Sequence, residues 1–240
     1  MHRFANPGRF TRLADTILPW LTLATVGLLG AGLYLGLFAS PADYQQGETV
    51  RIMYVHVPAA WMALFIYTNM AIASAAALIW RHPLAHVAAR ASAPLGAAFT
   101  FLALATGSLW GKPMWGTWWV WDARLTSVLI LFFLYLGYMA LHNAFEDAAR
   151  GQRAAAILAL VGFVNVPIIK FSVDWSNTLH QPASLTRLDA PAIHPDMLWP
   201  LLLMGIGYTT FFLTLLLLRM KSELIAARLR ALSLQTAAAE

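Results

Sequence analysis

The stretch ILPWLTLATVGLLGAGLYLGLFA decides the fold class, because it runs from Ile17 to Ala39 without a charged side chain. A helix needs about 20 mostly apolar residues to cross roughly 30 Å of hydrocarbon. Arg3, Arg9 and Arg12 precede the stretch, as basic residues precede a secretory signal peptide. The apolar part of a signal peptide is only about 7–15 residues long, however. We therefore expect a retained membrane span.

Five further stretches have the same character, at residues 57–80, 84–110, 125–141, 154–171 and 197–218. Each should be a helix, because a lone strand in lipid leaves backbone groups without hydrogen-bond partners. The composition agrees, since 60% of the 240 residues are hydrophobic and 11% are charged. In a typical soluble domain about 45–50% of the residues are hydrophobic and about 25% are charged. The sequence predicts an all-α integral membrane protein with six transmembrane helices in a single domain, residues 1–240.

The basic residues indicate the orientation of this bundle. Eleven lie at the two ends of the chain and in the second and fourth connections: Arg3, Arg9, Arg12, Arg81, Arg90, Arg150, Arg153, Arg219, Lys221, Arg228 and Arg230. The alternate connections hold five: Arg51, Lys112, Arg124, Lys170 and Arg187. Because cytoplasmic loops carry the excess of Lys and Arg, both termini are expected in the cytoplasm. The net charge of +5 then reflects topology, and we expect no nucleic acid as a partner.

Tryptophan is concentrated in one outer connection. Of ten tryptophans, five lie in WGKPMWGTWWVWDARLTS, residues 110–127: Trp110, Trp115, Trp118, Trp119 and Trp121. Tryptophan prefers membrane interfaces, but an interfacial belt is spread around a bundle. A cluster in one connection instead suggests a flat aromatic shelf, which suits a large planar apolar ligand.

The spacing within this segment suggests a local conformation. In a helix over 115–122, Trp115, Trp118, Trp119 and Asp122 would share one face. The glycines and the proline in GKPMWG argue against a long helix through the connection. We therefore expect a short helix at the membrane surface, with Asp122 and Arg124 at the polar edge of the shelf.

Topology also sorts the seven histidines, and three of them lie on the outer side. His56, in RIMYVHVPAAW, and His180, in VDWSNTLHQPAS, sit at the mouths of spans, whereas His194 lies between prolines and is interpreted as a loop residue. Two neutral imidazoles are the minimum protein set for six-coordinate haem iron. His56 and His180 are therefore candidate axial ligands. The alternative is a pair of interfacial histidines that bond to the backbone.

The residues that are absent narrow the chemistry. The chain has no cysteine, which excludes disulfides, thiolate nucleophiles and covalent attachment of c-type haem. It has no P-loop, HExxH or GxSxG motif, so we expect a protein that is not an enzyme. If haem is the ligand, its propionates need cationic partners. Arg51, Lys112, Arg124 and Arg187 are the candidates.

The tryptophan-rich segment together with both histidine contexts resembles the haem exporter protein C family of bacterial cytochrome c maturation system I, a member of the tryptophan-rich WWD-domain proteins. The resemblance covers about residues 15–220. It implies haem b held non-covalently at the periplasmic face of the inner membrane. His56 and His180 would be the axial iron ligands, and Trp115, Trp118, Trp119 and Trp121 the platform. Asp122 and Arg124 would complete the haem-binding set.

The resemblance also implies partners. They are the ATP-binding cassette subunits and membrane subunit of one complex, a small single-span subunit, and a membrane-anchored periplasmic haem chaperone that receives the haem. One position departs from the family pattern, because Ser176 follows Trp175 where a second tryptophan is often found. Two alternatives stay open, a membrane b-type cytochrome in electron transfer and a haem-free scaffold or permease subunit.

Overall fold

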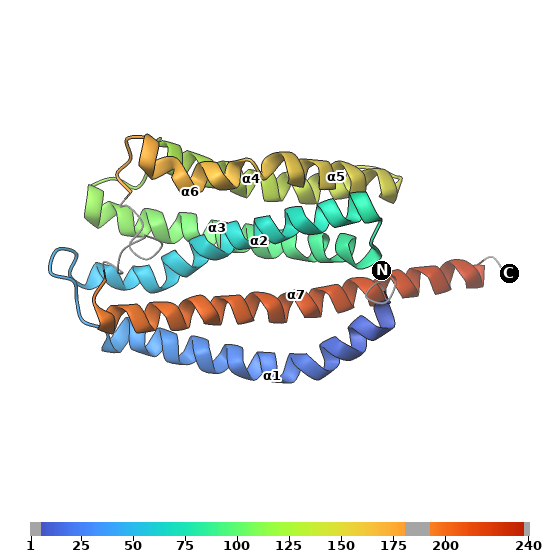
Figure 1. Ribbon diagram of the computed structural model, residues 1–240, viewed down its shortest axis with the longest axis horizontal. Coiled ribbons are helices and arrows are strands. Elements are labelled where there is room, and N and C mark those ends of the chain that lie inside the picture. Colours follow the sequence, from blue (N-terminus) through green and yellow to red (C-terminus); the bar gives the residue numbers. More distant parts are fainter. Residues whose placement is uncertain (1–5, 181–192, 238–240) are drawn as a thin grey trace.

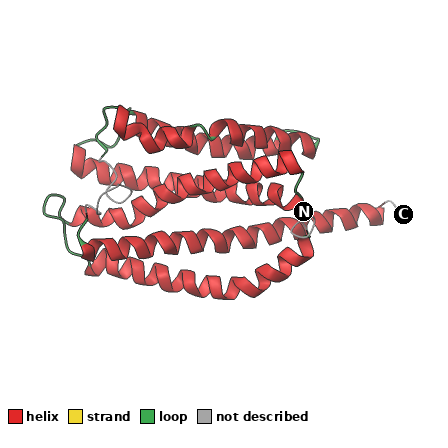
Figure 2. Ribbon diagram, viewed as in Figure 1, coloured by secondary structure: helices red, strands yellow, loops and turns green. Residues whose placement is uncertain are grey.

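The computed structural model describes residues 6–180 and 193–237, and this part of the chain is almost entirely helical (Figures 1 and 2). The elements in order are α1 (Pro7–Tyr34), the π-helical turn η2 (Leu35–Ala39), the 3₁₀ turn η3 (Glu48–Ile52), α2 (Met53–Trp80), α3 (Pro83–Trp115), α4 (Ala123–Asn143), α5 (Ala148–Gly162), α6 (Asn165–Trp175) and α7 (Pro195–Ala237). The six predicted spans are confirmed, because six helical stretches of this part are long and apolar enough to cross a membrane.

The bundle has α2 and α3 at its centre, with α1 and α7 on one side and α4, α5 and α6 on the other (Figure 1). Tyr67 and Tyr135 lie fully buried between α2 and α4. The Tyr135 hydroxyl donates to the carbonyl of Ala63, at 2.8 Å, and so satisfies its polar group inside an apolar core. Gly96 on α3 leaves the space for this ring, because a Cβ there would lie 2.1 Å from it.

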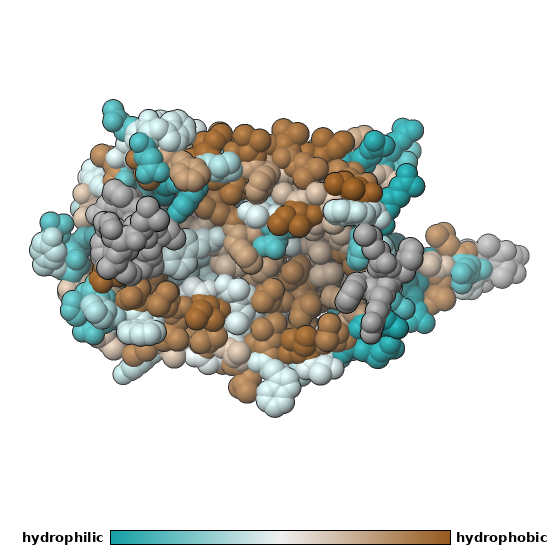
Figure 3. Space-filling view, viewed as in Figure 1, coloured by the Kyte–Doolittle hydropathy of each residue, from teal (hydrophilic) through white to brown (hydrophobic). Residues whose placement is uncertain are grey.

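On the face that Figure 3 shows, apolar side chains form a broad band across the middle of the bundle, and polar side chains collect toward its two ends. One end holds the described N-terminal residues and the α2–α3 and α4–α5 connections. We call this the basic end, after Arg81, Arg90 and Arg219. The opposite end, called the tryptophan end after Trp110–Trp121, holds the starts of α2, α4 and α7 and the ends of α3 and α6.

The fifth span is interrupted rather than continuous. Helix α5 ends at Gly162 and α6 begins at Asn165. The Asn165 amide donates to the carbonyl of Ser127 on α4, at 2.8 Å, which holds the second half against α4. Pro167 lies in the first turn of α6, where a missing N–H is tolerated. The last turns of the span follow this break and lead into the segment that carries His180.

Candidate functional site

His56 lies in the first turns of α2, at the tryptophan end, and its imidazole reaches α3. Its Nδ1 is 3.0 Å from the carbonyl oxygen of Ala103 and 3.1 Å from the hydroxyl oxygen of Thr106. The Thr106 hydroxyl itself donates to the carbonyl of Leu102, at 2.6 Å. Both neighbours of Nδ1 are therefore acceptors, so the proton resides on Nδ1 and the lone pair on Nε2. An imidazole fixed in this way presents Nε2 as a metal ligand.

The sequence of α3 leaves room for this ring. Gly107 faces the imidazole, and a Cβ at that position would lie 2.9 Å from Cε1 of His56. The indole of Trp110 meets the imidazole edge to face, with ring centroids 5.7 Å apart. Its Nε1 donates to the side chain of Gln46, at 2.9 Å, so the first outer connection is tied to the same place. His56 thus occupies a slot with backbone, hydroxyl and aromatic walls.

The tryptophan-rich segment differs from the predicted short helix. Helix α3 continues through Gly111 and Pro113 and ends only at Trp115, where Gly116 adopts a φ of +75°. Residues 116–122 are irregular, so the prediction of a helical face over 115–122 is wrong. The physical reason lies at Gly111, which is buried under the indole of Trp115. A Cβ there would lie 3.0 Å from Cε3 of that ring. The absence of a side chain at Gly111 lets the indole pack against the helix, and α3 continues through this position.

The four candidate platform indoles divide into two kinds. Trp118 and Trp121 are 55% and 76% exposed, whereas Trp115 and Trp119 are partly buried. Trp119 and Trp121 pack edge to face, with centroids 5.5 Å apart. The Nε1 of Trp119 is buried without a hydrogen-bond partner in the described part of the chain. An aromatic surface with an unpaired buried donor is an incomplete environment that an added ligand would complete.

Asp122 is buried and uses both carboxylate oxygens within the protein. Oδ1 accepts from the backbone N–H of Leu125, at 2.7 Å, and so caps the start of α4. Oδ2 accepts from the hydroxyl of Thr178. The oxygen of that hydroxyl accepts in turn from the backbone N–H of His180, at 3.1 Å. A relay of Asp122, Thr178 and His180 therefore ties the histidine segment to α4.

Arg124, two residues after Asp122, also links the start of α4 to the chain that leads to His180. Its Nε donates to the hydroxyl of Ser172, at 3.2 Å, and a terminal nitrogen donates to the carbonyl of Lys170, at 3.2 Å. Both acceptors belong to α6, which leads directly to the His180 segment. Arg124 therefore joins the beginning of α4 to the end of the fifth span.

His180 lies at the same end of the bundle as His56. The centroid of its ring is 6.5 Å from that of Trp115. It is also close enough to His56 for the two imidazoles to interact electrostatically. No group of three or more His, Asp or Glu side chains in residues 6–180 and 193–237 is arranged to hold a metal ion. Two imidazoles suit iron in a porphyrin better than a free ion, because the macrocycle supplies four further ligands.

The remaining outer residues have individual placements. Arg51 pairs with Glu48 and donates to the carbonyl of Leu37, at 2.8 Å, so it caps the first span. Lys112 donates to the carbonyl of Gly116, at 2.9 Å, and lies 5.9 Å from the centroid of Trp118. His194 is exposed and lies beside Asp196. It directly precedes α7 and is not helical, so it is a loop residue as predicted. Arg187 lies outside the described residues.

Sequence reasoning did not anticipate several contributors. Thr106 and Gly107 shape the His56 slot, and Thr178 and Ser172 hold the His180 segment. Thr178 stands two residues before a candidate ligand, which is a signal that could have drawn attention to it. Gly107 and Thr106 lie inside an apolar span and have no such signal.

Comparisons with known proteins identify the family of the chain. The model of the family described as "Heme exporter protein C" matches residues 1–235. A "Heme exporter protein C" of Bradyrhizobium diazoefficiens is 59% identical over 233 residues, covering 97% of this chain and 88% of that protein. Those of Haemophilus influenzae and Escherichia coli K12 are 52% and 49% identical over 225 residues, each covering 94% of this chain and 92% and 91% of the relatives. This multi-pass membrane protein therefore belongs to the haem exporter protein C family.

Proposed function

We propose that the chain binds haem b non-covalently at its tryptophan end and transfers it to a periplasmic, membrane-anchored haem chaperone during cytochrome c maturation. Membership of the family supports the general role in haem export and cytochrome c maturation. The observation that carries the finer proposal is the pair of imidazoles at one end of the bundle. His56 has its Nδ1 occupied by acceptors, so Nε2 is free to bind iron.

The indoles supply the second half of the site. Trp115 packs beside His180, and Trp118, Trp119 and Trp121 follow it in the same segment with part of their aromatic surface exposed. Haem is planar and apolar on both faces, so such surface holds it through burial of area and stacking. Exposed indoles imply a shallow site, which an incoming chaperone can reach. Non-covalent ligation by imidazole keeps the binding reversible.

We assign Asp122 and Arg124 a positioning role in this site. Asp122 reaches His180 through Thr178, and Arg124 binds the end of α6. Both side chains are thus engaged with the protein at the base of the His180 segment. Lys112 and its neighbour Trp118 lie at the exposed side, and we assign Lys112 to a haem propionate.

The orientation follows from the basic residues. The basic end carries most of the Lys and Arg side chains and therefore faces the cytoplasm. The tryptophan end then faces the periplasm of the inner membrane, where the chaperone is found. The transport step itself requires energy from outside this chain, and we propose that it acts as a subunit of an ATP-binding cassette complex with a membrane subunit and a small single-span subunit.

Absorption spectra of the full chain, purified in detergent from haem-replete cells, test the proposal. The wild-type protein should show a Soret band typical of six-coordinate, low-spin haem, released by acid organic solvent because the bond is non-covalent. His56→Ala and His180→Ala should each abolish this six-coordinate spectrum and lower haem content. His194→Ala is the matched control, because this outer histidine is exposed and pairs with Asp196, and it should leave the spectrum unchanged.

Three results would contradict the proposal. A colourless wild-type protein would exclude haem binding. A spectrum that changes in His194→Ala but not in His180→Ala would displace the ligand assignment. Rapid reduction of the bound haem by a quinol, with no transfer to the chaperone, would favour a b-type cytochrome.

A further inference from the structure

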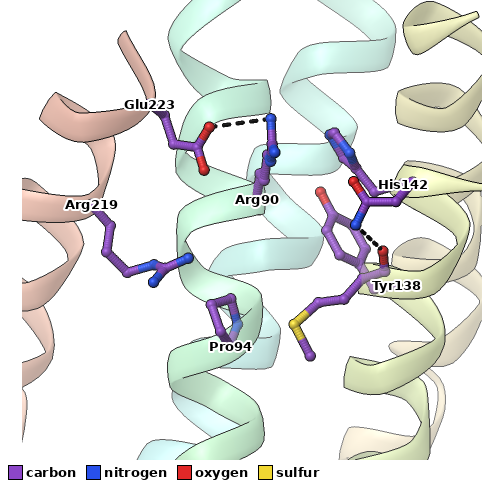
Figure 4. Close-up of a pocket in the computed structure, with 8 residues that line it drawn as sticks. Arg90, Pro94, Tyr138, His142, Arg219 and Glu223 are labelled. Carbon is purple, nitrogen blue, oxygen red and sulfur yellow. Dashed lines mark hydrogen bonds and ion pairs between the residues drawn. The ribbon is translucent and has the colours of Figure 1, made fainter. Parts of the chain in front are cut away.

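A cleft lies at the basic end of the bundle, at the opposite end of α3 and α4 from the candidate haem site. Figure 4 shows the side chains that line it. Its volume is about 170 Å³. Helices α4 and α7 each pack on α3, and residues of all three helices line the cleft. The lining includes Arg90 and Pro94 from α3, Tyr138 and His142 from α4, and Arg219 and Glu223 from α7.

The charges in this cleft do not balance. Arg90 and Glu223 form an ion pair across α3 and α7, at 3.1 Å. Arg219 stands one turn before Glu223 and points from α7 toward α3 (Figure 4). It makes no ion pair with any residue of the described chain. One guanidinium is therefore left over, and the site attracts an anion with a single charge.

The polar lining adds hydrogen-bonding capacity. The Nδ1 of His142 is buried and has no hydrogen-bond partner among residues 6–180 and 193–237. The ring of His142 packs beside that of Tyr138, with centroids 6.5 Å apart. Guanidinium groups bind phosphate oxygens through paired N–H donors, which is a stronger contact than a neutral hydrogen bond.

An apolar stripe leads out of the cleft toward the middle of the bundle. Pro94, Ala98 and Phe101 share one face of α3 because they are spaced by four and three residues. Ala98 is exposed, and Phe101 is 60% exposed and packs against Phe132 of α4. The charged head group of a phospholipid could therefore bind in the cleft while its apolar chain packs along the adjoining stripe.

We propose that this cleft binds the phosphate of an anionic phospholipid from the leaflet at the basic end, with one acyl chain along the Pro94–Phe101 stripe. The location fits, because the basic end is the cytoplasmic end and the cytoplasmic leaflet contains anionic lipids. The cleft is too small for a porphyrin but accommodates a phosphate group. The ligand would bridge α3, α4 and α7 and hold their ends together.

Native mass spectrometry of the delipidated full chain, titrated with phosphatidylglycerol or phosphatidylcholine of identical acyl chains, tests the site. Phosphatidylglycerol should bind more tightly. Arg219→Ala should weaken it about fivefold, the effect of one cation at a membrane surface. Arg153→Ala removes the same charge at the same end, outside the cleft, and should leave the affinity unchanged.

A second variant should act in the opposite direction. Glu223→Gln releases Arg90 from its ion pair, so the affinity for phosphatidylglycerol should rise. Glu146→Gln, an exposed carboxylate at the same end, is its control. Equal binding of the two lipids, or an unchanged affinity in both cleft variants, would overturn the proposal. Displacement of the lipid by millimolar inorganic phosphate would identify a site for soluble phosphate instead.

Discussion

The two candidate iron ligands are held in contrasting ways. His56 stands on α2, and its Nδ1 is fixed by backbone and hydroxyl groups of the neighbouring α3. His180 follows the end of α6 on an irregular segment, and side chains from α4 hold that segment. One imidazole is therefore part of a packed helix pair, whereas the other depends on a relay of hydrogen bonds. The difference suggests a fixed ligand and a releasable one, which the proposed transfer of haem would require.

The largest loss of haem affinity should come from a substitution that fills the slot around the fixed ligand, His56. In Gly107→Ala the new methyl group would lie 2.9 Å from Cε1 of the imidazole and force the ring out of position. Overpacking of this kind costs about 1–3 kcal/mol, so haem should bind about five- to 150-fold more weakly. The measurement is haem affinity by Soret titration of the full chain.

Gly30→Ala is the matched control for this substitution, because a Cβ there meets no atom within 4 Å. It introduces the same methyl group into a membrane helix and should leave haem affinity unchanged. Equal losses in the two variants would show that the slot around His56 is not special.

The next effect should come from the relay on the His180 side. Asp122→Ala removes the cap of α4 and the acceptor for Thr178 together. Loss of a cap costs about 1 kcal/mol, so thermal stability should fall modestly. The haem spectrum should shift toward a five-coordinate, high-spin form, because His180 loses its support while His56 keeps its own.

Asp122→Asn separates these two contributions. The single amide oxygen of asparagine still caps the helix, and the NH2 group in the place of Oδ2 can donate to the Thr178 hydroxyl oxygen, which can still accept from the backbone N–H of His180. This variant should therefore retain most of the six-coordinate spectrum. An alanine variant that lowers stability without changing the coordination would limit Asp122 to a structural role.

The smallest effect should come from the hydroxyl beside His56. Thr106→Val removes one of the two acceptors at Nδ1 and keeps the shape of the side chain. The Ala103 carbonyl remains, so the loss should be about 1 kcal/mol or less, roughly two- to fivefold in haem affinity. Thr106→Ser keeps the hydroxyl and should restore wild-type binding, together with the wild-type reduction potential of the haem.

The six spans could be predicted because uninterrupted apolar length is a property of the sequence alone. The stretch from Ile17 to Ala39 already lies within the first helical span, Pro7–Ala39. The sixth predicted span, residues 197–218, lies within α7, which continues to Ala237. The approach of His56 and His180 to one end also followed from counting crossings, since the number of spans between them is even.

The local conformation of the tryptophan-rich segment could not be predicted in the same way. Glycine and proline usually interrupt a helix. Here the ring of Trp115 packs against Gly111, where a Cβ would otherwise lie, and α3 continues to Trp115. That contact depends on the folded position of one side chain. Similarly, nothing in the sequence around Asp122 shows that its partner is Thr178, 56 residues away. Pairings between distant segments are fixed by packing, not by spacing.

Trp118 and Trp121 expose much of their indole surface when nothing lies on them. Each square ångström of apolar surface removed from water contributes about 25 cal/mol, so these rings favour any flat apolar partner. In the proposed site the two imidazoles approach the iron from opposite faces of the porphyrin, so these exposed rings would cover part of its edge and leave the rest of the edge open to the next carrier. Haem passed in this way between two apolar surfaces would never become fully hydrated. The proposed transfer would then be an exchange between two surfaces, and its equilibrium would depend on the difference in their affinities.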